Sequence, residues 1–212
     1  MEEKITKLVS DAQAVFMRFG IKSVNMEDIA RHLRVSKKTL YKYVSDKEDL
    51  VKKCFFLHCY QEEKEIQRIS LLQLNAIDES FETMHFIKDI IKDVHPSIMF
   101  DMEKYYPEVL QQTEEMRNKN IYSSVKANVE KGIEEGFYRK DLKADVIAHI
   151  YVKSVEAIFH SEQFIQSKNT LQELYLELFR YHIRGISSDQ GREYLIEKIK
   201  TEQTQNWQTQ NS

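Results

Sequence analysis

Glycine and proline are scarce in this sequence, which has 5 Gly and 2 Pro among 212 residues. Sheets and α/β folds use both residues at their many turns, so the scarcity favours long helices. The glycines also cannot be arranged as GxGxxG or as a Walker A loop, which argues against a nucleotide-binding enzyme. Sustained period-two alternation between turn residues is missing as well. We therefore expect an all-α fold.

Cysteines, a leader sequence and long apolar runs are also rare or absent. Only Cys54 and Cys59 are present, and the chain starts with acidic residues, Glu2 and Glu3, where a secretory signal peptide is basic. No run of about 18 uncharged apolar residues occurs, so we expect no membrane-spanning helix. These features predict a cytoplasmic protein whose two cysteines stay reduced.

Charge is unevenly distributed along a chain of globular composition, with 42% hydrophobic and 31% charged residues. Residues 1–54 have a formal net charge of +4, and the remainder has a formal net charge of −7. A basic end on an otherwise acidic protein suggests contact with a polyanion at that end only.

Apolar residues recur at helical spacing along most of the chain. The first stripe ends at Gly20, a typical left-handed helix end, and Asn25 and Ser36 can cap the two helices that follow. Pro107 is placed to begin a later helix and Gly136 to end it. The expected helices cover residues 5–19, 26–33, 37–43, 47–57, 81–91, 107–135, 144–159 and 171–184.

The sequence has no recognisable catalytic or metal-binding arrangement. Acid pairs such as Glu134 and Glu135 lie on predicted solvated helix faces, where nothing raises the pKa of one partner selectively. A nucleophile-elbow serine is absent, and the histidines have no partner at catalytic spacing. Cys54 and His58 share a helix face, but Cys59 points about 100° away from His58, which does not suit zinc. We therefore expect no enzyme activity, no metal and no cofactor.

Two short predicted helices with a turn between them form a helix-turn-helix pattern. Residues 36–47 contain four lysines and one acid, which can neutralise phosphates, while Tyr41 and Tyr43 offer hydroxyl donors on stiff rings. Thr39 is short enough to reach a base edge or a thymine methyl group. Leu40 falls on the opposite side and is expected in the core. The pattern predicts binding to duplex DNA.

Three blocks of this region, Ser23–Ala30, Val35–Val44 and Asp46–Leu50, resemble the DNA-binding domain of TetR-family transcriptional regulators. The resemblance covers roughly residues 5–55, where capping, apolar and basic positions agree together. It implies three amino-terminal helices for DNA and about six further helices that form a ligand-binding and dimerisation domain.

The resemblance also implies roles for individual residues. Asn25 and Met26 match the start of the second helix, which touches the DNA backbone, and Lys47 matches a lysine that meets a phosphate. Arg34 stands where the family commonly has glycine, at a cost on the order of 1 kcal/mol in a left-handed turn, and Val44 stands where it often has phenylalanine. The predicted DNA-binding residues are Asn25, Met26, Lys37, Lys38, Thr39, Tyr41, Lys42, Tyr43 and Lys47.

A single helix-turn-helix reads one half-site, so we expect a symmetric dimer on a palindromic operator. The helix predicted at 144–159 is apolar on more than one face, and the helix at 171–184 has a continuous apolar stripe. This pair can form a four-helix arrangement across a twofold axis, as the resemblance also implies, or it can fill the core of one subunit. The predicted dimer residues are Ile147, Tyr151, Val155, Ile158, Leu171, Leu174, Tyr175, Leu178 and His182.

An effector pocket is expected among aromatic and thioether side chains between the later helices. Such side chains also fill helix bundles that bind nothing, and His85, the polar candidate, is equally compatible with a structural histidine. The candidate ligand-binding residues are Phe81, His85, Met99, Phe100, Met102, Tyr105, Tyr122, Tyr151 and Phe159.

The whole sequence predicts nine to ten helices in a DNA-binding domain at 1–46, an effector-binding and dimerisation domain at 47–200, and a polar, disordered tail at 201–212 that contains Trp207. The predicted function is that of a homodimeric transcriptional repressor that binds operator DNA and responds to an unknown small molecule. The alternative is a helical protein-interaction module whose basic patch is only a solvated face.

Overall fold

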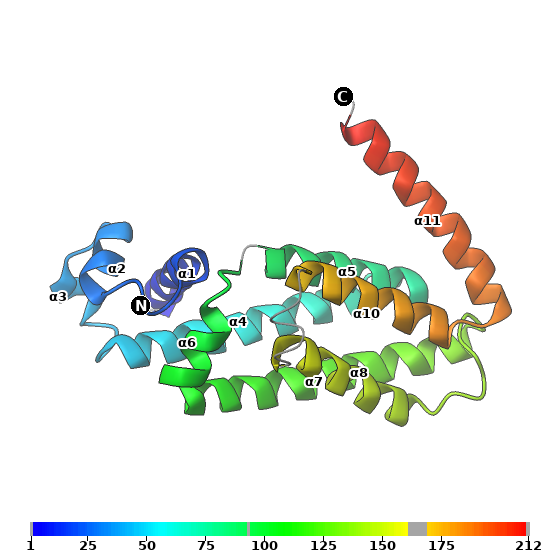
Figure 1. Ribbon diagram of the computed structural model, residues 1–212, viewed down its shortest axis with the longest axis horizontal. Helices are drawn as coiled ribbons and strands as arrows, with labels where there is room; N and C mark the ends of the chain where they lie inside the picture. Colours follow the sequence, from blue (N-terminus) through cyan, green and yellow to red (C-terminus); the bar gives the residue numbers. More distant parts are fainter. Residues whose placement is uncertain (1, 93, 161–168, 211–212) are drawn as a thin grey trace. The chain divides into compact units, whose positions relative to one another are not determined.

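The computed structural model describes residues 2–92, 94–160 and 169–210, with side chains from residue 4 to residue 201 within these ranges. These residues form ten helices and no strand, so the all-α prediction is confirmed (Figure 1). None of the helices in this part of the chain combines the length and the hydropathy that a membrane span requires. The helices are α1 (Glu2–Phe19), α2 (Met26–His32), α3 (Lys37–Leu40), α4 (Lys47–Ser70), α5 (Ala76–Lys92), α6 (Ile98–Tyr105), α7 (Pro107–Glu134), α8 (Ala144–His160), α10 (Leu171–Ile186) and α11 (Asp189–Gln210).

The chain divides into two compact units. Unit 1 comprises residues 1–67 and 89–120, and unit 2 comprises residues 68–88 and 121–212. The long helices α4, α5 and α7 therefore contribute residues to both units. A functional division between DNA binding and effector binding near residue 46 stays a prediction.

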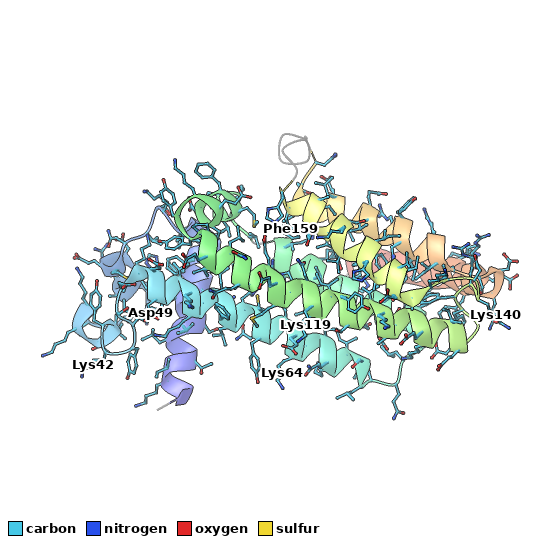
Figure 2. All side chains as sticks on the ribbon, turned by 90° about the horizontal axis from the view of Figure 1, so that it is seen from below. Lys42, Asp49, Lys64, Lys119, Lys140 and Phe159 are labelled. Carbon is cyan, nitrogen blue, oxygen red and sulfur yellow. The ribbon has the colours of Figure 1, made fainter. Side chains whose placement is uncertain are left out.

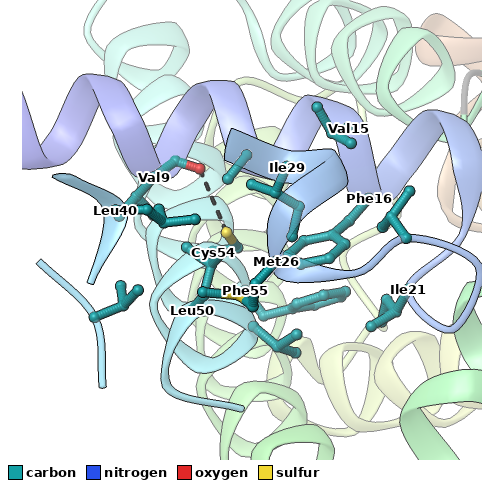
Figure 3. Close-up of a cluster of buried hydrophobic side chains, with 14 of the residues drawn as sticks. Val9, Val15, Phe16, Ile21, Met26, Ile29, Leu40, Leu50, Cys54 and Phe55 are labelled. Atoms are coloured by element: carbon teal, nitrogen blue, oxygen red, sulfur yellow. Dashed lines mark hydrogen bonds between the residues drawn. The ribbon is translucent and has the colours of Figure 1, made fainter. Parts of the chain in front are cut away.

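Unit 1 is organised around one hydrophobic cluster that contains residues of α1, α2, α3, α4, α6 and the first turn of α7. Figure 3 shows the part of this cluster that comes from α1 to α4. Phe16, Ile29, Leu40 and Leu50 have no exposed surface, and Met102 of α6 is equally buried among them. Burying a side chain of this size contributes roughly 1.5–3 kcal/mol. The helix-turn-helix is thus packed together with α6, a helix nearly 60 residues further along the chain.

The predicted helix ends agree with the structure at several positions. Gly20 and Gly136 both have a φ of +81°, the left-handed conformation expected of them. The third helix is shorter than predicted, because α3 ends at Leu40. Beyond Leu40 the backbone hydrogen bonds join residues three apart, as in a 3₁₀ turn: Lys42 N donates to Thr39 O (3.2 Å) and Tyr43 N donates to Leu40 O (3.0 Å).

The sequence did not predict α6 or α11. Residues 201–210 continue α11, so the expectation of a disordered tail after residue 200 is wrong for these residues. Polar residues such as these can continue a helix that has already begun, since propagation requires no apolar face. The side chain of Trp207 lies outside the described residues.

Unit 2 contains the packed pair α8 and α10 and a buried tyrosine that joins α5 to α7. Tyr138 has no exposed surface, and its hydroxyl lies 3.1 Å from Ala76 O and 3.0 Å from Asn128 Oδ1. A Cβ atom on Gly132 would lie 2.1 Å from this ring. Glycine is therefore required at this point of α7 for the ring to reach the buried carbonyl.

Candidate nucleic-acid interface

The amino terminus of α2 is capped by the residues predicted from the sequence. The Asn25 side chain accepts hydrogen bonds from the backbone N–H groups of Glu27 (2.8 Å) and Asp28 (3.0 Å), and the Asp28 carboxylate accepts one from Asn25 N (3.1 Å). This capping box fixes the start of the helix. The Met26 side chain is buried in the core, so only its backbone is placed to approach DNA.

The turn between α2 and α3 is left-handed at Arg34, whose φ is +54°. Beside it, Val35 N donates to Ala30 O at 3.0 Å. Ser36 then caps α3, because its hydroxyl accepts from Thr39 N (3.0 Å) and also lies 2.8 Å from the Thr39 hydroxyl. The turn keeps the geometry that favours glycine, although an arginine occupies it.

A basic surface surrounds α3, while Leu40 fixes the opposite side of the helix in the core. Lys37, Lys38 and Lys42 are exposed, and Tyr41 is 44% exposed beside them. Figure 2 shows Lys42 at the surface of the turn that follows α3. Among the described residues these three lysines make no ion pair, so their charge is not neutralised within the protein. We name Lys37, Lys38, Tyr41 and Lys42 the basic face.

Two other predicted DNA residues are less exposed. Thr39 is half-buried, and its hydroxyl is engaged with Ser36, which leaves its methyl group for contact with a base. Tyr43 is half-buried against the core, and its carbonyl accepts from Lys53 Nζ at 3.1 Å. Val44 is 3% exposed and takes the core position that the family often gives to phenylalanine.

Lys47, the predicted phosphate contact, is held by the backbone that precedes α2. Its ammonium donates to Ile21 O at 2.7 Å and to Val24 O at 2.6 Å. Burial lowers the pKa of Lys47, and the nearby Asp101 carboxylate opposes this shift. An ammonium has three donors, so one remains for a phosphate. Lys47 therefore also connects α4 to the segment between α1 and α2, a role that the sequence did not indicate.

Several predicted effector residues lie in unit 1 and differ in their burial. Met102 is fully buried in the core that supports the helix-turn-helix, and Met99 is half-buried on the same short helix. Phe100 is 58% exposed and Tyr105 is 38% exposed, so both lie at the surface, and their role as pocket residues stays a prediction. The Lys104 ammonium lies 5.2 Å from the Phe100 ring centroid, as in a surface cation–π contact.

The other predicted effector residues belong to unit 2. Phe81 is buried with its ring edge-on to Phe179, at a centroid distance of 5.1 Å, and 6.4 Å from the half-buried His85 ring. Tyr122 instead donates to Asp145 near the surface. Phe159 is half-buried near the carboxyl end of α8 (Figure 2).

A polar group of side chains lies between α8 and α10. The Tyr151 ring is 4.5 Å from the His182 ring, and Tyr151 is hydrogen-bonded to Tyr175. Burial raises the pKa of Tyr151 to about 12 and lowers the pKa of His182 to about 4. All three side chains are therefore neutral at pH 7. We name Tyr151, Tyr175 and His182 the polar cluster of unit 2.

The predicted dimer residues fall into two groups. Val155, Ile158 and Tyr175 are at least 92% buried within the single chain, which leaves them no surface for a partner. Their burial favours the alternative of a core position within one subunit, and the dimer interface itself stays a prediction. The half-buried ones are Ile147, Tyr151, Leu171, Leu174, Leu178 and His182.

Three other apolar residues of α8 and α10 are exposed, and none of them is among the predicted dimer residues. Val146 and Ile150 of α8 are 47% and 57% exposed, and Tyr181 of α10 is 82% exposed. Tyr181 is seven residues after Leu174, so both lie on one side of α10. A Cβ atom on Gly185, one helical turn later, would meet nothing within 4 Å. We name Val146, Ile150 and Tyr181 the apolar face.

The two cysteines point to different parts of the core. Cys54 Sγ lies 3.4 Å from Val9 O (Figure 3), and Cys59 Sγ lies 3.7 Å from Thr113 O. Burial raises the pKa of both thiols, which disfavours the thiolate that metals bind. In the described part of the chain no three His, Cys, Asp or Glu side chains are grouped as metal ligands.

Comparison with known proteins gives the same picture of the amino-terminal region. Residues 8–54 match the family model described as bacterial regulatory proteins, tetR family. A search of curated protein sequences gave no match.

Solved structures share the fold over nearly the whole chain. A TetR-family transcriptional regulator from Agrobacterium tumefaciens is similar with a TM-score of 0.67 and 16% identity, covering 88% of this chain and 99% of that one. A transcriptional regulator from Cytophaga hutchinsonii has a TM-score of 0.67 and 16% identity, with 87% and 99% covered. The fatty acid degradation regulator FadR from Bacillus halodurans has a TM-score of 0.62 and 14% identity, with 84% and 94% covered.

Proposed function

We propose that this chain is a DNA-binding transcriptional regulator of the TetR family, and that it acts as a homodimeric repressor that a small molecule releases from its operator. The match of residues 8–54 to the tetR family model and the fold shared with TetR-family structures support the proposal. The family is one of regulators and not of enzymes. The observation that carries the proposal is the basic face, which presents three unpaired lysines and an exposed tyrosine on a helix fixed by Leu40.

The basic face suits a duplex because its lysines form no ion pair with the side chains that the structure describes. Lys37, Lys38 and Lys42 are assigned to phosphates or to guanine acceptors, and the Tyr41 hydroxyl to a phosphate. Asn25 is exposed at the start of α2, and it is assigned to a phosphate together with the backbone of Met26. The Thr39 methyl group and the half-buried Tyr43 complete the proposed contact.

Dimerisation is assigned to the apolar face. Tyr181 is 82% exposed and Ile150 is 57% exposed, and a partner related by a twofold axis would cover both. Two recognition helices are then set about 34–36 Å apart, the distance between half-sites of a palindromic operator.

Effector binding is assigned to the interior of unit 2, around the polar cluster and Phe81. Neutral tyrosine hydroxyl and imidazole groups, together with the aromatic pair Phe81 and Phe179 of the same unit, suit an apolar molecule with one or two hydrogen-bonding groups. The small-molecule fraction of a lysate from cells that encode the protein should release it from its operator. Operator binding that is indifferent to every such fraction would contradict this part of the proposal.

The central experiment measures fluorescence anisotropy of a labelled duplex taken from just upstream of the coding sequence, across a salt series. We expect the logarithm of affinity to fall by about 0.9 per neutralised phosphate with the logarithm of salt concentration. Tyr41→Ala should weaken binding to this duplex. Tyr60→Ala is the matched control, because Tyr60 is 51% exposed on α4 and lies outside the basic face.

Binding that shows no salt dependence, or that both variants weaken equally, would contradict DNA recognition by the basic face and favour a protein-interaction module. Dimerisation is tested separately by sedimentation of Tyr181→Glu, with Tyr60→Glu as control. We expect only the first variant to become monomeric and to lose operator affinity. A dimeric Tyr181→Glu protein would show that the interface lies elsewhere.

A further inference from the structure

The backbone segment of residues 20–25, which leads into α2, is held by a buried carboxylate of α6. Asp101 is 4% exposed, and its Oδ2 atom accepts hydrogen bonds from Ile21 N at 3.0 Å and from Lys22 N at 2.9 Å. The Ser97 hydroxyl donates to the same oxygen at 3.3 Å. Hydrogen bonds to a charged acceptor contribute more than neutral ones, and their loss inside a protein is costly.

Further contacts between α6 and this segment come from the same side of the helix. Ser97, Asp101 and Tyr105 are spaced four residues apart, so they form one face. A Cβ atom on Gly20 would lie 2.6 Å from Ser97 Oγ, and the Lys22 ammonium lies 4.0 Å from the centroid of the Tyr105 ring. One face of α6 therefore contacts three consecutive residues of the segment.

Lys47 holds the same segment from α4. Its ammonium donates to the carbonyls of Ile21 and Val24, while Asp101 accepts from the N–H groups of Ile21 and Lys22. Both polar atoms of the Ile21 backbone are thus bonded to buried or half-buried charges of opposite sign. Val24 directly precedes Asn25, the cap of α2.

We infer that Asp101 is a positioning residue for operator binding: it fixes the segment of residues 20–25 and thereby sets the start of α2 on the DNA backbone. This inference rests on the proposed function of the basic face. It assigns to α6 an indirect part in DNA recognition, since Asp101 acts through the segment of residues 20–25 and does not touch DNA.

The sign of the effect distinguishes positioning from simple electrostatics. Asp101 carries a negative charge within the unit that binds a polyanion, so its neutralisation alone should strengthen DNA binding. Loss of the hydrogen bonds should instead allow the start of α2 to move, which weakens the specific complex. Asp101→Asn keeps the size of the side chain and removes the charge, and Asp101→Ala removes the acceptor as well.

The test compares the full-length protein and its variants on two labelled duplexes. One carries the sequence that the wild-type protein enriches from a random duplex pool, and the other is a scrambled duplex of equal length. For Asp101→Ala we expect affinity for the enriched duplex to fall by about ten-fold or more, since a charge-assisted hydrogen bond corresponds to roughly that factor. Affinity for the scrambled duplex should stay equal or rise. Asp101→Asn should show a smaller loss in the same direction.

Glu103→Gln is the matched control, because Glu103 is an exposed acid of the same helix. It should leave the preference for the enriched duplex unchanged. Amide hydrogen exchange provides the structural readout: in Asp101→Asn the Ile21 and Lys22 amides should exchange faster, while the amides of Leu50 and Val51 in α4 keep their protection.

Unchanged or tighter binding of Asp101→Ala to the enriched duplex would overturn the inference. An equal loss on both duplexes would also overturn it, because general unfolding of the unit produces that result. If the wild-type protein enriches no sequence, the proposed function fails, and the role of Asp101 in DNA binding fails with it. Amide exchange then still shows whether Asp101 holds the segment.

Discussion

Replacing Arg34 by glycine should stabilise the protein, although it removes an exposed side chain and adds a flexible residue. Arg34 has a φ of +54°, and left-handed backbone costs a residue with a Cβ atom roughly 1–2 kcal/mol. Glycine loses more conformational entropy on folding, which offsets about 0.5–1 kcal/mol of this relief. The net expected gain is therefore about 0.5–1 kcal/mol. In a protein of this length that corresponds to a rise of roughly 1–4 °C in the unfolding midpoint.

The matched variant is Arg31→Gly, at the next-to-last residue of α2. Arg31 is helical and 72% exposed at its side chain, so the same substitution should destabilise by about 1 kcal/mol. Both variants are compared with wild type by thermal and guanidinium unfolding followed by circular dichroism. A loss of stability in Arg34→Gly, or equal effects in the two variants, would refute the reasoning from backbone conformation.

Two further predictions concern unit 2. Gly132→Ala should destabilise the protein by about 1–3 kcal/mol, because the new Cβ atom would lie 2.1 Å from the Tyr138 ring. Gly185→Ala should stabilise it by about 0.5–1 kcal/mol, since the new Cβ atom would meet nothing within 4 Å. Guanidinium unfolding measures both effects, and a similar outcome for the two glycines would contradict the packing argument. Burial lowers the pKa of His182 from 6.5 to about 4. Between pH 6.5 and 4, therefore, the imidazole is protonated in the unfolded chain and neutral in the folded chain, which favours unfolding. The free energy of unfolding should lose up to about 3 kcal/mol as pH falls from about 6.5 to 4, and His182→Leu should show a smaller loss over this range. Identical pH profiles for the variant and the wild type would show that His182 is not the group responsible.

The helix-turn-helix was predictable because its signals are local. Asn25 and Ser36 cap helices through N–H groups two or three residues away, and Gly20 ends a helix in the conformation that glycine favours. Each of these signals lies within a few residues of the helix end that it marks. The match of residues 8–54 to the family model confirms the resemblance to the TetR family. The role that the resemblance implies for each position stays a prediction.

The assignment of faces on α8 and α10 was harder for a physical reason. Tyr175, Phe179 and Ile183 are buried in the subunit, while Leu174 and Tyr181 lie on an adjacent side of the same helix. Consecutive helix residues point about 100° apart, so apolar residues on two adjacent sides of a helix follow one another closely in the sequence and read as a single stripe. The pattern shows that a helix is apolar, and only the packed structure shows which side a second subunit can reach.

The contact of Asp101 with residues 20–25 had no sequence signal at all. Its hydrogen-bonded partners are backbone N–H groups 79 and 80 residues away, and every non-proline residue carries such a group. Short α6 also begins without a side-chain cap, so nothing in its sequence indicated a helix between Pro96 and Pro107. A buried carboxylate that bonds only to backbone and a serine leaves no complementary charge pattern to find. Asp101 therefore gains its proposed importance from the fold alone, through the placement of α6 against the segment that begins the DNA-binding helix pair.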